Sequence, residues 1–131
     1  MTHLLLGELS LQGSHFFTIL EQMPKRDFLG GFELIVLLAL LRLREDAYGV
    51  PIVREIEERT RREVAVGSVY ATLERLEEKG LVSSVLGDST PERGGRAKKY
   101  FHITALGLRQ VRSTRRALES LWHRLPQLEG A

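Results

Sequence analysis

The sequence predicts a mainly α-helical protein with one small β-hairpin. Three observations lead to this expectation. Three stretches between residues 28 and 79 have the composition or the apolar spacing of helices. Two short runs of β-branched and aromatic residues follow, with a polar segment containing Gly and Pro between them. A fourth stretch with helical spacing comes last, so the order is helix, helix, helix, hairpin, helix in a chain of 131 residues, which fits one domain.

Composition narrows the class of protein. The chain is 43% hydrophobic and 27% charged, and its formal net charge of +2 permits a nucleic-acid partner without establishing one. The absence of cysteine excludes disulfides and cysteine-based zinc sites, and no apolar run is long enough to cross a membrane. The four histidines lack metal-ligand spacing, and no GxSxG, P-loop or GxGxxG motif occurs. We therefore expect a cytoplasmic protein that is not an enzyme and has no metal or cofactor.

Residues 1–26 form an N-terminal extension for which two interpretations stay open. The stretch is apolar without a clear period, two glycines interrupt it, and it lacks the basic start of a signal peptide. It is either an extra helix that packs on the domain, or an addition upstream of a true initiator at Met23.

Residues 28–43 and 49–60 are expected to form the first two helices. Leu and Ala fill the first, and its apolar residues lie almost all round, which suits a helix buried on several sides. In the second, Ile52 and Ile56 share one face. Pro51 falls in the first turn, where its missing N–H costs no hydrogen bond.

Residues 66–79 show the clearest helical pattern. Gly80 follows them at the position where a left-handed residue ends a helix. Apolar residues recur at i, i+3, i+4, i+7 and i+10 and predict one buried stripe, formed by Val66, Val69, Tyr70, Leu73 and Leu76. The opposite face is then expected to carry Gly67, Ser68, Ala71, Thr72 and Arg75. Small and hydrogen-bonding side chains near a helix N-terminus suit the major groove of DNA, and an ordinary solvated face is the alternative.

Residues 81–86 and 98–103 are expected to pair as a hairpin with a long connecting loop. Cations on a flexible, glycine-containing arm suit contacts with DNA phosphates or insertion into the minor groove. The candidates are Arg93, Gly94, Gly95 and Arg96 in the loop, and Lys98 and Lys99 where the second strand begins. Three short helices followed by such a hairpin describe a winged helix-turn-helix domain over residues 27–104. The hairpin with its loop, residues 81–103, is the wing of this domain.

Thr104 is the expected N-cap of a last helix that runs to about Leu125. Arg115 interrupts an apolar seam with alternating spacings of four and three. The seam consists of Leu108, Val111, Leu118, Trp122 and Leu125, with Leu121 beside it. One winged domain offers no place to bury so long a stripe, so residues 105–131 are predicted to be a dimerisation helix and tail. Trp122 fits either the core of that interface or a flat ligand pocket at the dimer centre.

Three stretches together resemble the PadR family of transcriptional regulators. They are "FELIVLLALLRLREDAYGVPIVREIEERT", "VGSVYATLERLEEKGLV" and "PERGGRAKKYFHIT". The resemblance covers residues 27–107 and implies a homodimeric winged-helix repressor that a small-molecule or stress signal releases from DNA. It also implies that Tyr48, Tyr70 and the basic residues of the wing contact the DNA backbone. Ala65 departs from the pattern, because similar sequences often have Ser there as the helix cap.

These observations predict a dimeric repressor that binds an inverted-repeat operator in double-stranded DNA. The alternative is a winged-helix module that binds another protein and no DNA. Salt distinguishes the two, because DNA affinity that depends on several phosphate contacts falls steeply as the salt concentration rises.

Overall fold

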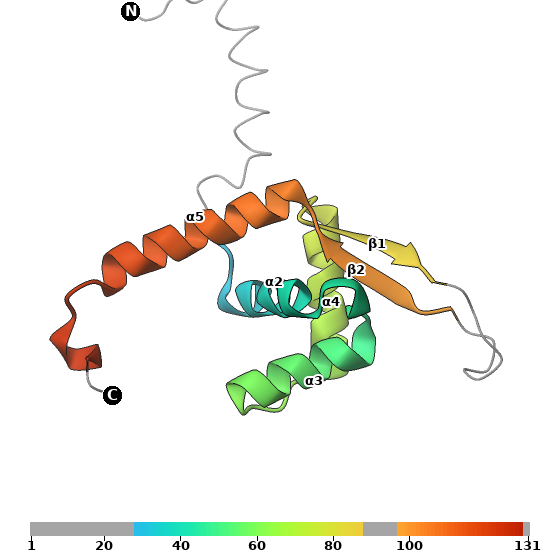
Figure 1. The fold of residues 1–131 in the computed structure, drawn as a ribbon, viewed down its shortest axis with the longest axis horizontal. Helices are drawn as coiled ribbons and strands as arrows, with labels where there is room; N and C mark the ends of the chain where they lie inside the picture. Colours follow the sequence, from blue (N-terminus) through green and yellow to red (C-terminus); the bar gives the residue numbers. More distant parts are fainter. Residues whose placement is uncertain (1–27, 88–96, 130–131) are drawn as a thin grey trace, which may run out of the picture.

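A computed structural model describes residues 28–87 and 97–129 and is mainly helical with one hairpin, as expected (Figure 1). The N-terminal extension and four wing residues, Arg93, Gly94, Gly95 and Arg96, lie outside the described residues. The elements are α2 (Gly31–Leu43), the 3₁₀ turn η1 (Arg44–Asp46), α3 (Gly49–Thr60), α4 (Val66–Glu78), β1 (Val82–Leu86), β2 (Lys99–Ile103), α5 (Ala105–Trp122) and the 3₁₀ turn η3 (Pro126–Leu128).

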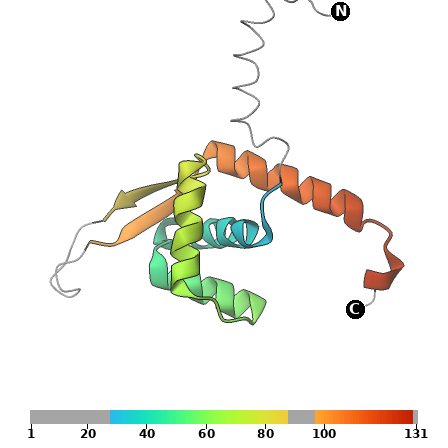
Figure 2. The same cartoon turned by 180° about the vertical axis from the view of Figure 1, so that it is seen from behind.

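The core lies around α2, which contacts α3, α4, β2 and α5 (Figures 1 and 2). This position explains why the α2 sequence is apolar almost all round, since several of its sides meet other elements. Val36 and Leu37 of α2 are fully buried, together with Ile52 of α3 and Leu73 of α4. The hydrophobic contacts of one helix therefore hold the domain together.

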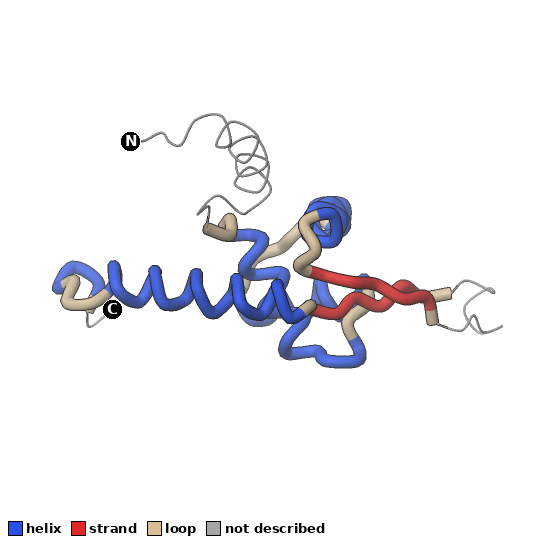
Figure 3. The backbone as a smooth tube through the Cα atoms, turned by 90° about the horizontal axis from the view of Figure 1, so that it is seen from above, coloured by secondary structure: helices blue, strands red, loops and turns tan. Residues whose placement is uncertain are grey.

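The hairpin consists of two antiparallel strands in which Ser84 is opposite Phe101. Figure 3 shows the strands side by side and extending away from the helices. Phe101 is buried, which agrees with the alternation along β2, because every second side chain faces the same side of a sheet. The Phe101 N–H also donates to the Ala47 carbonyl at 2.8 Å, so the segment before α3 lies along β2. This bond anchors the base of the wing to the start of α3.

Hydrogen bonds join the end of α4 to the start of α5. Gly80 has a φ of 78°, the left-handed conformation expected of it where α4 ends. Thr104 caps α5 as predicted: its hydroxyl accepts from the Gly107 N–H at 3.0 Å and donates to the Gly80 carbonyl at 2.7 Å. At the other end of α4, Ala65 is the N-cap residue and makes no side-chain capping bond.

Helix α5 is shorter than predicted and projects away from the domain (Figure 1). It ends at Trp122, and Leu125 lies beyond it in an extended conformation, because the following Pro126 disfavours the helical conformation in the residue before it. Val111 is buried, whereas every described residue after Ala117 is exposed. Only the first half of α5 is thus covered by the rest of the domain.

Candidate nucleic-acid interface

Helix α4 is rotated about its axis relative to the stripe predicted from its sequence. The prediction that Thr72 faces outward is wrong, because Thr72 is only 2% exposed, whereas Val66 is 53% and Tyr70 39% exposed. The Thr72 hydroxyl is satisfied in this position, since it accepts from Arg75 Nη2 at 3.3 Å. Packing against α2, α3 and β1 sets the rotation of α4. A Thr can face the core where a hydrogen-bond donor such as Arg75 is within reach of its hydroxyl.

The exposed side of α4 carries Gly67, Ala71, Glu74 and Glu78, which we call the outer ridge. Ser68 is also exposed, beside the first turn of this ridge. A Cβ atom added at Gly67 would meet nothing within 4 Å, so open space surrounds the start of the helix. The structure therefore places Gly67, Ser68 and Ala71 on the accessible face, as predicted, and adds the two glutamates.

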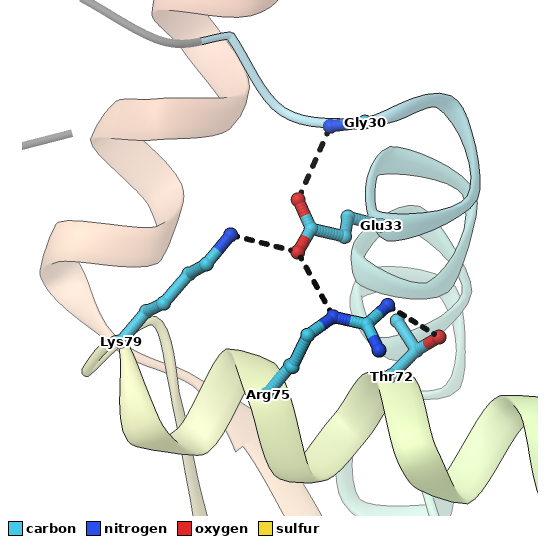
Figure 4. Close-up of polar contacts among 5 residues, drawn as sticks. All are labelled: Gly30, Glu33, Thr72, Arg75 and Lys79. Atoms are coloured by element: carbon cyan, nitrogen blue, oxygen red, sulfur yellow. Dashed lines mark hydrogen bonds and ion pairs between the residues drawn. The ribbon is translucent and has the colours of Figure 1, made fainter. Parts of the chain in front are cut away.

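Arg75 lies to one side of the outer ridge and faces a buried carboxylate (Figure 4). Its Nε atom is 3.8 Å from Oε2 of Glu33, and Lys79 Nζ is 2.8 Å from the same oxygen. Oε1 of Glu33 accepts from the Gly30 N–H at 3.1 Å, the reciprocal half of a capping box at the start of α2. The carboxylate thus joins the N-terminus of α2 to the last turns of α4.

The surroundings of Glu33 favour its charged form. Burial raises the pKa of this carboxyl, but hydrogen bonds from Lys79 and the Gly30 N–H, together with the charges of Lys79 and Arg75, outweigh the burial. The pKa of Glu33 therefore lies below its ordinary value. The sequence patterns considered above give Glu33 no role, although an acid in the first turn of an otherwise apolar helix is a signal for a buried ion pair.

Aromatic and basic side chains meet where α3, α4 and the wing converge. The rings of Tyr48 and Tyr100 pack edge to face with centroids 5.2 Å apart, and Lys98 Nζ lies 3.7 Å from the centroid of the Tyr48 ring. Tyr70 packs in the same manner on Phe101 at 6.4 Å. We call Tyr48, Tyr70, Lys98 and Tyr100 the wing junction.

Gly49 leaves room for this arrangement, because a Cβ atom there would collide with the Tyr70 hydroxyl. The structure thus brings together three residues that the sequence had singled out separately, Tyr48, Tyr70 and Lys98. Tyr100 was missed, although strand alternation places it on the face of β2 opposite Phe101. Lys99 is exposed at the base of the wing, with its Nζ atom 5.7 Å from the centroid of the Phe101 ring.

Comparison with known proteins connects this geometry to a family. The family model described as the transcriptional regulator PadR-like family matches residues 37–113, which run from within α2 to within α5. The chain belongs to the PadR-like family. The expected resemblance is confirmed, and the protein is a transcriptional regulator with a DNA-binding winged helix.

Solved structures show the same relationship. The PadR-like transcriptional regulator from Bacillus cereus strain ATCC 14579 is 25% identical over 84% of this chain and 98% of its own, with a TM-score of 0.62. The complex structure of hsRosR-S1 is 28% identical over 79% of this chain and 84% of its own, with a TM-score of 0.61. A PadR family regulator from Eggerthella lenta DSM 2243, at 24% identity, 87% and 90% coverage and a TM-score of 0.57, shares the fold.

No curated protein matches the sequence. Each helix in the described part of the chain is too short or too polar to cross a lipid bilayer.

Proposed function

We propose that this PadR-like protein is a homodimeric repressor whose α4 enters the major groove of an inverted-repeat operator while the wing lies on the adjacent backbone. One observation carries the proposal. Helix α4 exposes Gly67, Ser68 and Ala71 on its surface, and Tyr70 from the same turns packs on Phe101 of the wing. A slender helix and a basic hairpin thus form neighbouring parts of one surface, which is the arrangement by which winged helices bind a duplex.

In the major groove, Gly67 and Ala71 let the backbone of α4 approach the bases, and the Ser68 hydroxyl donates or accepts a hydrogen bond. Thr72 is left out of these contacts because it is buried. Arg75 contacts DNA only if its side chain turns away from Glu33, and at 54% exposure it is free to do so.

The wing supplies the contacts with the backbone. Lys98 and Lys99, with Arg93 and Arg96 of the loop, neutralise phosphates, and Gly94 and Gly95 let the loop approach closely. The Tyr48 hydroxyl donates to a phosphate oxygen, and the ammonium group of Lys98 holds its ring from one side.

The salt dependence of operator binding tests this arrangement. Arg96→Ala should weaken binding to all sequences and reduce the slope of log K against log salt by about 1, because one phosphate contact is lost. Arg116→Ala, the same change on the exposed surface of α5, is the matched control and should leave the slope unchanged. An unchanged slope for Arg96→Ala would remove the wing from the interface. Binding to DNA that is weak and insensitive to salt would favour the protein-interaction module instead.

Dimerisation is proposed to involve the second half of α5. Leu121 and Trp122 are 75% and 61% exposed, and a groove between α2 and α5 is lined by Leu34, Leu38 and Leu118 among others. Such an apolar surface on a helix that projects from the domain is typical of an interface between subunits. Arg115 and Glu119 also line this groove, and they pair with each other at 2.9 Å, so the carboxylate offsets the charge of Arg115 beside the apolar side chains.

Sedimentation velocity tests the interface with single charges. Leu121→Glu should yield a monomer, because the substitution places a carboxylate in the apolar contact. The native Leu121 side chain is highly exposed, so the fold of one subunit does not depend on it. Ser120→Glu adds the same charge on the other side of α5 and should remain a dimer. A dimer that persists in Leu121→Glu would exclude this face of α5.

The proposal further includes release by a small-molecule or stress signal, action in the cytoplasm and no catalytic activity.

A further inference from the structure

The middle of the outer ridge presents an acid to the surface that would face DNA. Gly67 and Ala71 reach outward by at most one carbon atom, and Arg75 is turned toward Glu33, so Glu74 is the first long polar side chain along the ridge. We propose that Glu74 determines specificity by accepting a hydrogen bond from the N4 amino group of a cytosine in the major groove. This inference rests on the proposed function, because it requires α4 to lie in that groove.

The spacing along α4 allows this contact. Glu74 lies seven residues after Gly67, or about 10 Å along a helix that rises 1.5 Å per residue, which is close to the height of three base pairs. The small residues at 67 and 71 let the helix backbone sit deep in the groove, and the longer Glu side chain then spans the greater distance to the bases where the helix tilts away.

The described structure leaves the Glu74 carboxylate available. The ion pairs within residues 28–87 and 97–129 engage Glu33, Glu55 and Glu119, and hydrogen bonds from Ser84 and the Val64 N–H occupy Glu77 and Glu57. Glu74 takes part in none of these contacts. An acid placed among phosphates with no compensating donor lowers affinity, so binding in this orientation needs a donor from the DNA.

The chemistry of the base edges selects cytosine. A carboxylate only accepts hydrogen bonds, and in the major groove guanine presents the acceptors N7 and O6 while thymine presents the acceptor O4. Adenine has an amino donor, but its neighbouring N7 acceptor repels the second carboxylate oxygen. Cytosine presents the N4 amino donor without an adjacent acceptor on the same base, and it is therefore the preferred partner of Glu74.

The assignment is tested by selecting the fragments that each purified protein binds from a pool of random double-stranded DNA. The proteins compared are wild type, Glu74→Gln and Glu78→Gln. Wild type should enrich cytosine at one symmetric position of each half-site, by about tenfold or more over other bases. Glu74→Gln should change that position to adenine, because a Gln amide both donates to N7 and accepts from N6. Glu78→Gln removes the same charge one turn further along the ridge and should keep the cytosine preference.

Two results would overturn the inference, and they differ. If Glu74→Gln binds all sequences more tightly and keeps the wild-type preference, Glu74 acts only by charge and the assignment is wrong while the proposed function stands. If wild type enriches no sequence above the input, the proposed function itself fails and the assignment fails with it. Glu74 is exposed, so equal thermal unfolding of wild type and Glu74→Gln serves as the check that the fold is intact.

Discussion

Replacing Glu33 with Gln should destabilise the protein by removing the charge that joins α2 to α4. The carboxylate is 10% exposed and accepts from Lys79 Nζ at 2.8 Å, with Arg75 Nε at 3.8 Å. A Gln side chain has the same size and keeps an oxygen that can accept from the Gly30 N–H. The substitution therefore isolates the contribution of the negative charge from that of packing.

The expected loss is about 2 kcal/mol in the free energy of unfolding. A hydrogen bond to a charged group contributes roughly 1.5–3 kcal/mol, and a negative charge in the first turn of a helix adds roughly 0.3–1 kcal/mol. Lys79 and Arg75 are 51% and 54% exposed, so water solvates them once the carboxylate is gone. The lower part of the range therefore applies, below the roughly 3–5 kcal/mol for breaking a fully buried ion pair.

The contribution of Glu33 should depend on pH in a defined direction. Its pKa in the folded protein lies below the ordinary value of 4.5. At pH values between the folded and the unfolded pKa, the unfolded state therefore binds more protons than the folded state. The stabilisation is present in full above the unfolded pKa and is lost as the pH falls through the folded pKa. The difference between wild type and Glu33→Gln should thus be constant from neutral pH to about pH 5.5 and shrink below it.

Urea unfolding at one fixed protein concentration measures this difference, because the stability of the proposed dimer would depend on concentration. Glu58→Gln, at an exposed position of α3, is the control and should change stability by less than about 0.5 kcal/mol. A loss for Glu33→Gln as small as that of the control would refute the reasoning. So would a full-sized loss that stays the same below about pH 4.

Substitutions at three further positions test packing and capping. Gly107→Ala should lower the free energy of unfolding by about 2 kcal/mol despite the better helix propensity of Ala. The reason is that its Cβ would collide with the Leu81 backbone carbonyl and displace α5. An unchanged urea midpoint would contradict this prediction. Gly49→Ala should cost less than about 1 kcal/mol, because its Cβ would meet only the end of the Tyr70 side chain, which can move. The substitution should nevertheless shift the NMR signals of the Tyr70 ring. Unshifted signals would argue against the contact. Thr104→Ala should cost about 1 kcal/mol through loss of the α5 cap, whereas Thr104→Ser should retain most of it in the same assay.

Local signals along the chain were enough to predict the order of elements and many of their ends. The start of α3 at Gly49, the left-handed Gly80 and the cap at Thr104 all agree with the structure, because turns and caps depend on residues within a few positions of each other. The C-terminus of α5 was predicted too long. Its seam continues to Leu125 in sequence, but the chain leaves the helix at His123, which is extended, and Arg124 has a φ of 57°. The conformational restriction before Pro126 then keeps Leu125 itself out of a helix.

Helical spacing states which side chains share a face, but the direction of that face depends on what the helix packs against. For this reason Thr72, which the sequence placed outward, is buried, and Tyr70 lies partly exposed at the wing. The contact between Glu33 and Lys79 joins residues that are 46 positions apart, and no local pattern predicts such a pairing. Periodicity and turn chemistry are properties of neighbouring residues and are readable in the printed chain. The rotation of α4 and the partners of its charges arise only when distant segments pack together.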